Sequence, residues 1–93
     1  MPWRRVSALS PTVVTLFHAP GCHLCDRARR VLLAAREELG FELAEVDISG
    51  EPELEARYRE WLPVVEIGGE RAFVYHVDPI GLRRKLARVS RGG

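Results

Sequence analysis

The chain of 93 residues lacks several features that would assign it to a common class. No apolar run approaches the roughly 20 residues that a membrane-spanning helix needs. Acidic and basic residues nearly cancel, at a formal net charge of +1, so the composition predicts neither a nucleic-acid partner nor an anionic membrane partner. We also expect no internal repeat, no linker and no second domain, because no segment shows the corresponding patterns. With 46% apolar residues the chain suits a single modest core, and we expect a monomer.

The N-terminus only superficially resembles a signal peptide. A basic start precedes a mildly apolar stretch, but Ser7, Ser10 and Pro11 interrupt that stretch. Cleavage beyond them would remove the first predicted strand of the domain. We therefore expect residues 1–10 to form a flexible extension, residues 11–90 to form the domain, and the protein to be cytoplasmic.

Cysteine is scarce, because Cys22 and Cys25 are the only two in the chain. They follow a β-branched run and a Pro20-Gly21 loop, and they open an amphipathic helix. A thiol at a helix N-terminus lies beside unpaired N–H groups and the positive end of the helix dipole, which lowers its pKa. A second cysteine three residues later lies on the same face, close enough to form a disulfide. In a reducing cytosol such an isolated pair is more often catalytic or metal-binding than structural.

Hydrophobic periodicity predicts an α/β domain with the element order βαβαββα. The strands are expected at 12–17, 41–48, 61–67 and 71–75, and the first and last helices at about 23–39 and 78–89. A short helix is expected to start at residues 49–52. The expected buried positions are Leu24, Ala28, Val31, Leu32, Ala35 and Leu39 in the first helix, Leu54 and Tyr58 in the second, and Leu82, Leu86 and Val89 in the third.

Turn signals define how these elements connect. Gly40 is expected to terminate the first helix, and Asp78 with Pro79 to start the last one. A helical crossover makes the first two strands parallel, and Gly68-Gly69 predicts a hairpin between the last two. The result is a four-stranded mixed sheet with helices on both faces.

These motifs resemble the glutaredoxins and the small bacterial glutaredoxin-like proteins. The likeness covers about residues 12–89 and is carried by the strand–Cys-x-x-Cys–helix unit, by Leu62-Pro63 about forty residues later, and by the Gly-Gly hairpin. It implies a minimal thioredoxin fold and thiol–disulfide exchange, with Cys22 as nucleophile and Cys25 as resolving thiol. It also implies that Pro63 is a cis-proline facing the thiols and that the Leu62 backbone pairs with an extended substrate.

Three positions depart from the glutaredoxin pattern. His18 stands where glutaredoxins usually carry a lysine that holds a glutathione carboxylate, and the usual Gly-Gly-x-Asp segment before the last helix is missing. His23-Leu24 replaces the frequent Pro-Tyr or Pro-Phe between the cysteines, and a histidine there favours the thiolate. We therefore expect no tightly bound cofactor and only weak dependence on glutathione, which is still a possible reductant.

Other interpretations of the cysteine pair stay open at this point. Zinc or an iron–sulfur cluster could use both cysteines, but one helical turn rarely wraps them and the nearby His18 and His23 around one ion. A redox-inactive interaction module is the other alternative. For the preferred function, the expected partners are protein or small-molecule disulfides, with glutathione or a thioredoxin-reductase-type enzyme as reductant. Trp61 is expected either to shape the substrate site or to pack under its loop.

Overall fold

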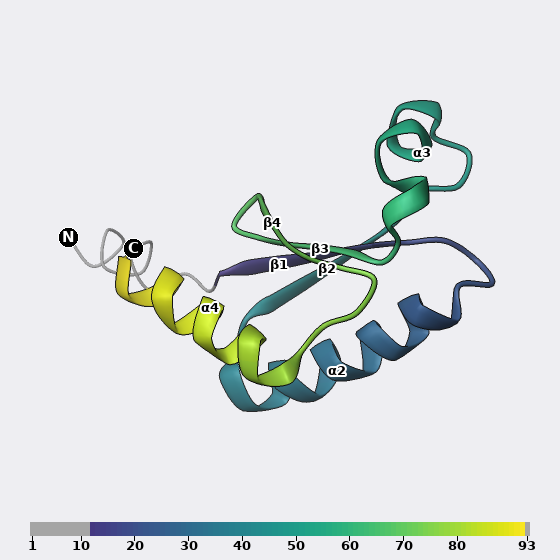
Figure 1. Cartoon of the computed structure of the whole chain (residues 1–93). Helices are drawn as coiled ribbons and strands as arrows, with labels where there is room; N and C mark the ends of the chain where they lie inside the picture. The colour runs from purple at the N-terminus through teal and green to yellow at the C-terminus, as the bar shows by residue number, and fades with distance from the viewer. Residues whose placement is uncertain (1–11, 93) are drawn as a thin grey trace.

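The computed structural model describes residues 12–92, so the extension predicted for residues 1–10 lies outside it. The elements, in chain order, are β1 (Val13–His18), α2 (His23–Leu39), β2 (Glu42–Asp47), α3 (Pro52–Tyr58), the 3-10 turn η1 (Arg59–Trp61), β3 (Val64–Ile67), β4 (Glu70–Val74) and α4 (Pro79–Gly92) (Figure 1). The predicted order βαβαββα is confirmed. Within the described range no helix is long and apolar enough to cross a bilayer.

The four strands form one mixed sheet in the order β2-β1-β3-β4. β1 runs parallel to β2 and antiparallel to β3, and β4 is antiparallel to β3. The last residues of β1, β2 and β4 therefore lie at the same end of the sheet as the start of β3. We call this the thiol end, and its connections are residues 19–22, 48–63 and 75–78. The opposite, hairpin end has the connections 40–41 and 68–69.

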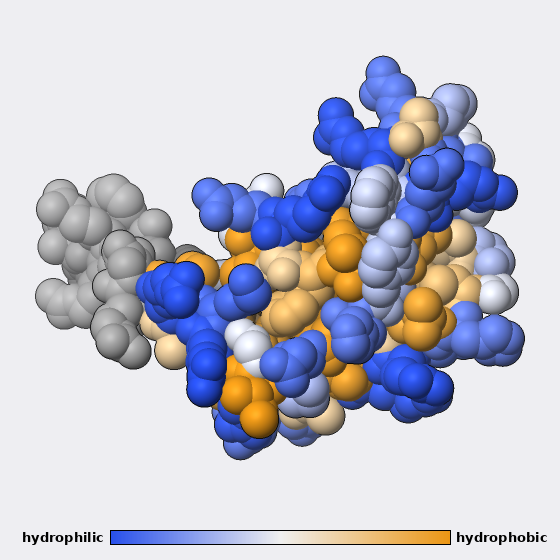
Figure 2. All heavy atoms as spheres, viewed as in Figure 1, coloured by the Kyte–Doolittle hydropathy of each residue, from blue (hydrophilic) through white to orange (hydrophobic). Residues whose placement is uncertain are grey.

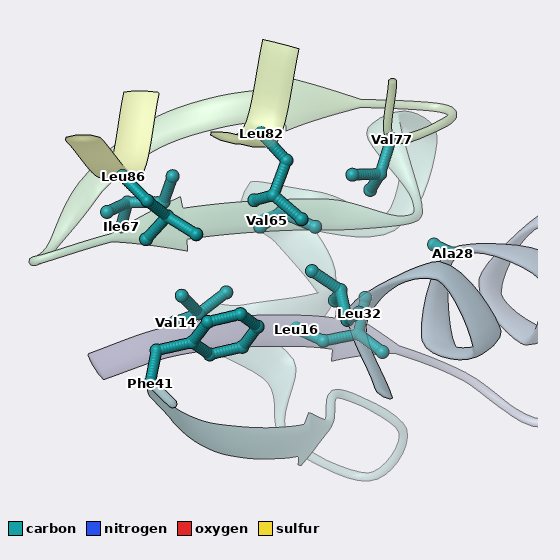
Figure 3. Packing of buried hydrophobic residues seen from close by; sticks show 10 residues of the cluster. All are labelled: Val14, Leu16, Ala28, Leu32, Phe41, Val65, Ile67, Val77, Leu82 and Leu86. Carbon is teal, nitrogen blue, oxygen red and sulfur yellow. The ribbon is translucent and has the colours of Figure 1, made fainter. Parts of the chain in front are cut away.

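The larger core lies between one face of the sheet and the helices α2 and α4 (Figure 3). Its strand residues alternate along the chain, because successive side chains of a strand point to opposite faces. The buried members are Val14, Leu16, Ala28, Leu32, Phe41, Val65, Ile67, Val77, Leu82 and Leu86. Burying one such leucine fully contributes about 1.5–3 kcal/mol to the free energy of folding. Packing in this layer therefore sets the position of α2 relative to the strands.

A smaller core occupies the other face of the sheet, at the thiol end. Phe17, Ile48, Tyr58 and Val64 are its buried members, and α3 covers them. The rings of Phe17 and Tyr58 stack with centroids 4.2 Å apart, and the Tyr58 hydroxyl donates to Glu66 Oε2 at 2.9 Å. Figure 1 shows α3 on the opposite side of the sheet from α2 and α4. Helices thus cover both faces, as predicted.

The predicted helix ends are present. Gly40 closes α2 with φ at 78°, and its N–H donates to the Arg36 carbonyl at 2.9 Å. At the start of α4, Asp78 Oδ2 accepts the Gly81 N–H at 3.0 Å, and the Asp78 carbonyl accepts the Leu82 N–H at 2.8 Å. These contacts satisfy backbone groups that a helix terminus otherwise leaves unpaired.

Several sequence predictions need correction. Trp61 was expected to open a strand, but it ends η1 and β3 starts only at Val64. Leu24, Leu39 and Val89 were expected to be buried, but they are 42%, 41% and 37% exposed. For α2 the reason is length: its 17 residues span about 25 Å, whereas the six residues of β1 span about 20 Å. Both ends of the helix therefore extend past the sheet.

Candidate active site

Cys22 is the N-cap residue of α2. Its backbone is extended, with φ −93° and ψ 104°, while its carbonyl already accepts the Asp26 N–H at 3.1 Å. Its Sγ accepts the Cys25 N–H at 3.1 Å, which is the bond that a serine or aspartate oxygen usually makes at this position. When the pair is reduced, this N–H and the helix dipole favour the thiolate of Cys22.

The two cysteines differ in their access to solvent. They form a disulfide with Cα atoms 5.1 Å apart. Cys22 is partly exposed at the thiol end, whereas Cys25 is only 3% exposed, on the first turn of α2. The Cys22 side of the disulfide is therefore accessible from solvent, and the Cys25 side is not.

The segment Leu62–Pro63 lies at the same end of the sheet. Its peptide bond is cis, as predicted. Phe17, near the end of β1, pairs with Val64, so Pro63 lies beside the point where the chain leaves β1 for the cysteines. Pro63 is buried, and its carbonyl accepts the Tyr75 N–H at 2.9 Å. The sheet thus brings together two segments that are forty residues apart in sequence.

The two candidate histidines flank the cysteines differently. His18 is the last residue of β1 and pairs in register with Asp47 of β2. Hydrogen bonds from the Ser49 side chain, at 2.6 Å, and the Ser49 N–H, at 2.9 Å, lower the pKa of the Asp47 carboxyl, and the charge of His18 contributes less. His23 is the first residue of α2 and is exposed beside Cys22.

A metal site would need donors beyond those that this chain brings together. Within residues 12–92 no three His, Cys, Asp or Glu side chains lie close enough to hold an ion. The metal or iron–sulfur alternative would therefore require a second chain for its remaining ligands, since such sites commonly use four.

One feature of the thiol end was not predicted from sequence. Trp61 and Tyr75 are 43% and 44% exposed, and their ring centroids are 6.1 Å apart. Trp61 is thus not packed under its loop. Tyr75, predicted to end a strand, lies just past β4 with φ at 73°, the one described residue other than glycine with positive φ. Sequence patterns carry no signal for a tyrosine in this conformation, because glycine or asparagine is usual there.

Comparison with known proteins agrees with this geometry. The glutaredoxin-like domain family (DUF836) matches residues 13–87. An uncharacterized protein of Mycobacterium tuberculosis is 33% identical over 89 residues, covering 90% of this chain and 92% of that protein. A solved protein from X. campestris is 31% identical, with TM-score 0.69 over 81% of this chain and 96% of its own. A mutant thioredoxin from Halobacterium salinarum, 19% identical, shares the fold with TM-score 0.66 over 92% and 80%. The chain therefore belongs to the glutaredoxin-like domain family and has a thioredoxin fold.

Proposed function

We propose that the protein is a thiol–disulfide oxidoreductase that works through Cys22 and Cys25. The observation that carries the proposal is the pairing of a partly exposed sulfur at the N-terminus of α2 with a buried one three residues later. The family and the fold support a redox role for this pair. The different access of the two sulfurs supports the finer assignment, glutaredoxin-like exchange with disulfides of other molecules.

The exchange takes place in two steps. The Cys22 thiolate attacks one sulfur of a substrate disulfide, so a mixed disulfide forms and the other substrate sulfur leaves and takes a proton. The Cys25 thiolate then attacks the Cys22 sulfur. This closes the Cys22–Cys25 bond and releases the second substrate thiol. Two electrons pass from the protein to the substrate, and the protein ends as the disulfide form.

The residues around the cysteines have supporting roles in this proposal. The Leu62 backbone pairs with an extended substrate next to Pro63, and His18 and His23 contribute to substrate binding. We further propose that the reaction occurs in the cytosol on protein or small-molecule disulfides, without a tightly bound cofactor. Glutathione or a thioredoxin-reductase-type enzyme would then reduce the Cys22–Cys25 disulfide again.

Covalent trapping tests the division of roles. Cys25→Ser keeps the attacking thiol and loses the resolving one, so it should accumulate mixed disulfides with a peptide or protein disulfide. Cys22→Ser should accumulate none, and unmodified protein should proceed to the Cys22–Cys25 disulfide and release both substrate thiols. Non-reducing gels and mass spectrometry measure the adducts. Equal trapping by both variants would contradict the assignment, and inertness of the unmodified protein toward every disulfide would contradict the function.

Iron or zinc retained during anaerobic purification would instead favour the metal-binding alternative.

A further inference from the structure

The aromatic pair Trp61–Tyr75 borders the segment proposed to bind substrate. Trp61 precedes Pro63 by two residues, and the Tyr75 N–H is bonded to the Pro63 carbonyl at 2.9 Å. Both rings are nearly half exposed, although large aromatic side chains usually gain free energy from burial. Such an exposed pair beside the Leu62–Pro63 segment is suited to contact a partner.

The position of Tyr75 is fixed from two sides. Its hydroxyl donates to the Glu60 carbonyl at 3.2 Å, and its N–H donates to Pro63. Its φ of 73° is unfavourable for a residue with a Cβ, and conformations of this kind persist where surrounding contacts determine them. The ring is therefore held beside Trp61 before any partner arrives, which reduces the entropy lost on binding.

The connections of the thiol end, on which both aromatic residues lie, carry a net negative charge. The connections of the thiol end carry five acidic and two basic residues, a net charge of −3: Glu51, Glu53, Glu55, Glu60 and Asp78 against Arg57 and Arg59. The Arg59 guanidinium lies 3.7 Å from Glu55, and that of Arg57 lies 6.0 Å from the Tyr58 ring centre. Both basic groups thus have contacts within this region, and Figure 2 shows a largely hydrophilic surface over α3. The residues of α4, by contrast, include basic side chains and no acidic one.

We propose that the Trp61–Tyr75 pair receives a lysine or arginine side chain of a polypeptide whose disulfide reacts with Cys22. This inference rests on the proposed exchange function and specifies its substrate class. Aromatic faces attract cations, with tryptophan the strongest, and the acidic connections add attraction at longer range. Glutathione disulfide has a net negative charge and no lysine or arginine side chain, so the acidic connections disfavour it.

The strand order defines where the cation lies along the substrate. The ends of β1, β3 and β4 are neighbours, and two strand spacings separate β1 from β4 by about 10 Å. An extended chain advances about 3.3 Å per residue. An extended substrate segment that runs from Cys22 across the ends of β1, β3 and β4 would therefore place a residue two or three positions from its reactive cysteine at the aromatic pair.

Matched peptide disulfides test this selectivity. The peptides differ only in carrying arginine or glutamate two positions from the cysteine, on either side of it in separate pairs. The second-order rate constant for oxidation of the reduced protein is measured for each. The arginine peptide should react faster, and the preference should fall with rising salt. Trp61→Ala should slow the arginine peptide by about two- to fivefold and leave the glutamate peptide unchanged. Val89→Ala, which removes an exposed apolar side chain on α4, should change neither rate.

Two charge variants sharpen the test. Glu60→Gln, beside Trp61, should reduce the arginine preference, whereas Glu70→Gln at the hairpin end should leave it intact. Equal rates for the arginine and glutamate peptides, or equal slowing of both by Trp61→Ala, would overturn the inference while leaving the exchange function in place.

A binding measurement separates this inference from the chemistry. Trp3 and Trp61 are the only tryptophans, so Trp3→Phe leaves the fluorescence of Trp61 as a reporter. Peptides with serine in place of cysteine cannot exchange, and the arginine version should still quench Trp61 at lower concentration than the glutamate version. If this preference is present but no peptide disulfide is reduced, the exchange function fails and the docking site stands. If the two versions bind alike, the docking site is wrong.

Discussion

The two ends of the sheet are built in different ways. At the hairpin end the connections 40–41 and 68–69 contain only two residues each, and their glycines adopt positive φ values of 78°, 60° and 87°. At the thiol end the connections 19–22, 48–63 and 75–78 are longer, and they carry the exposed cysteine, the cis peptide bond and the exposed aromatic pair. The short connections keep the neighbouring elements close together. The longer connections are positioned by the sheet and can hold functional residues.

The two ends of the sheet also differ in which residues adopt positive φ values. At the hairpin end the positive φ values fall on glycines, which adopt them without a steric cost. At the thiol end Gly21 and Gly50 adopt positive φ values as well, but so does Tyr75, which is held by hydrogen bonds to Pro63 and Glu60. The hairpin end should therefore respond to substitution mainly through stability, and the thiol end mainly through exchange.

The largest effect on stability is expected from a substitution in the core midway between the two ends of the sheet. The packing of both ends depends on this core. Leu32 is fully buried in α2, and Leu32→Ala should lower the free energy of unfolding by about 2–5 kcal/mol through lost burial and a residual cavity. For a domain of this size the melting temperature should fall by roughly 10 °C or more. Leu39→Ala, at a position 41% exposed in the same helix, is the control and should cost less than about 1 kcal/mol. Equal losses in thermal melts would mean that the core does not depend on α2 as described.

The sequence predicted most of the architecture because the relevant signals are local. A glycine at 40, an aspartate before Pro79 and two glycines at 68–69 each satisfy a backbone requirement at one point of the chain. The cis bond before Pro63 followed from the family likeness and not from spacing.

What the sequence could not supply depends on the relative lengths and packing of elements. Helical periodicity gives the direction of the apolar stripe in α2 but not where the sheet beneath it ends, so Leu24 and Leu39 were wrongly expected to be buried. The exposure of Trp61 and the positive φ of Tyr75 arise from contacts between the segments around residues 60 and 75. No local pattern encodes such contacts.

A second effect is expected at the thiol end, on the rate of reaction with a glutathione mixed disulfide. A lysine carries a full positive charge at pH 7 and a histidine little, so His18→Lys should raise the rate with a glutathione mixed disulfide. One charge-assisted hydrogen bond to a carboxylate contributes about 1.5–3 kcal/mol, but Asp47 is the register partner of residue 18 and would neutralise part of the new charge. We therefore expect about a three- to tenfold gain, and a larger gain in the double variant with Asp47→Asn. A high glutathione rate in the unmodified protein would contradict this reasoning.

A further effect, on stability and not on the exchange rate, is expected at the hairpin end. Gly69 has φ at 87° and open space around the position of an added Cβ, so Gly69→Ala should cost only backbone strain, about 1–2 kcal/mol. The melting temperature should fall by roughly 4–8 °C per kcal/mol, with kcat/KM for disulfide exchange unchanged. Gly69→Asn should lose less, because asparagine tolerates this conformation better. A decrease in exchange at temperatures where Gly69→Ala is folded would break the separation between the two ends.

The smallest effect concerns a polar contact at the thiol end. Two hydrogen bonds from Ser49 hold the pKa of the Asp47 carboxyl below its usual 3.8. The bond from the Ser49 side chain contributes more than the bond from its N–H. A carboxyl whose pKa is lower in the folded protein stabilises the fold above its unfolded pKa, and that contribution disappears as the pH falls through the folded value. Ser49→Ala removes the larger contribution and keeps the backbone bond, so the pKa of Asp47 should rise part of the way toward 3.8. Carboxyl-carbon NMR titration measures this shift.

The stability difference between Ser49→Ala and the unmodified protein should be present at pH 6 and shrink below about pH 4, the range in which an aspartate takes up its proton. Because Asp47 is fully exposed, the difference should be smaller than that for Gly69→Ala. An unchanged titration of Asp47 in Ser49→Ala would show that the hydrogen bonds from Ser49 do not control this carboxylate.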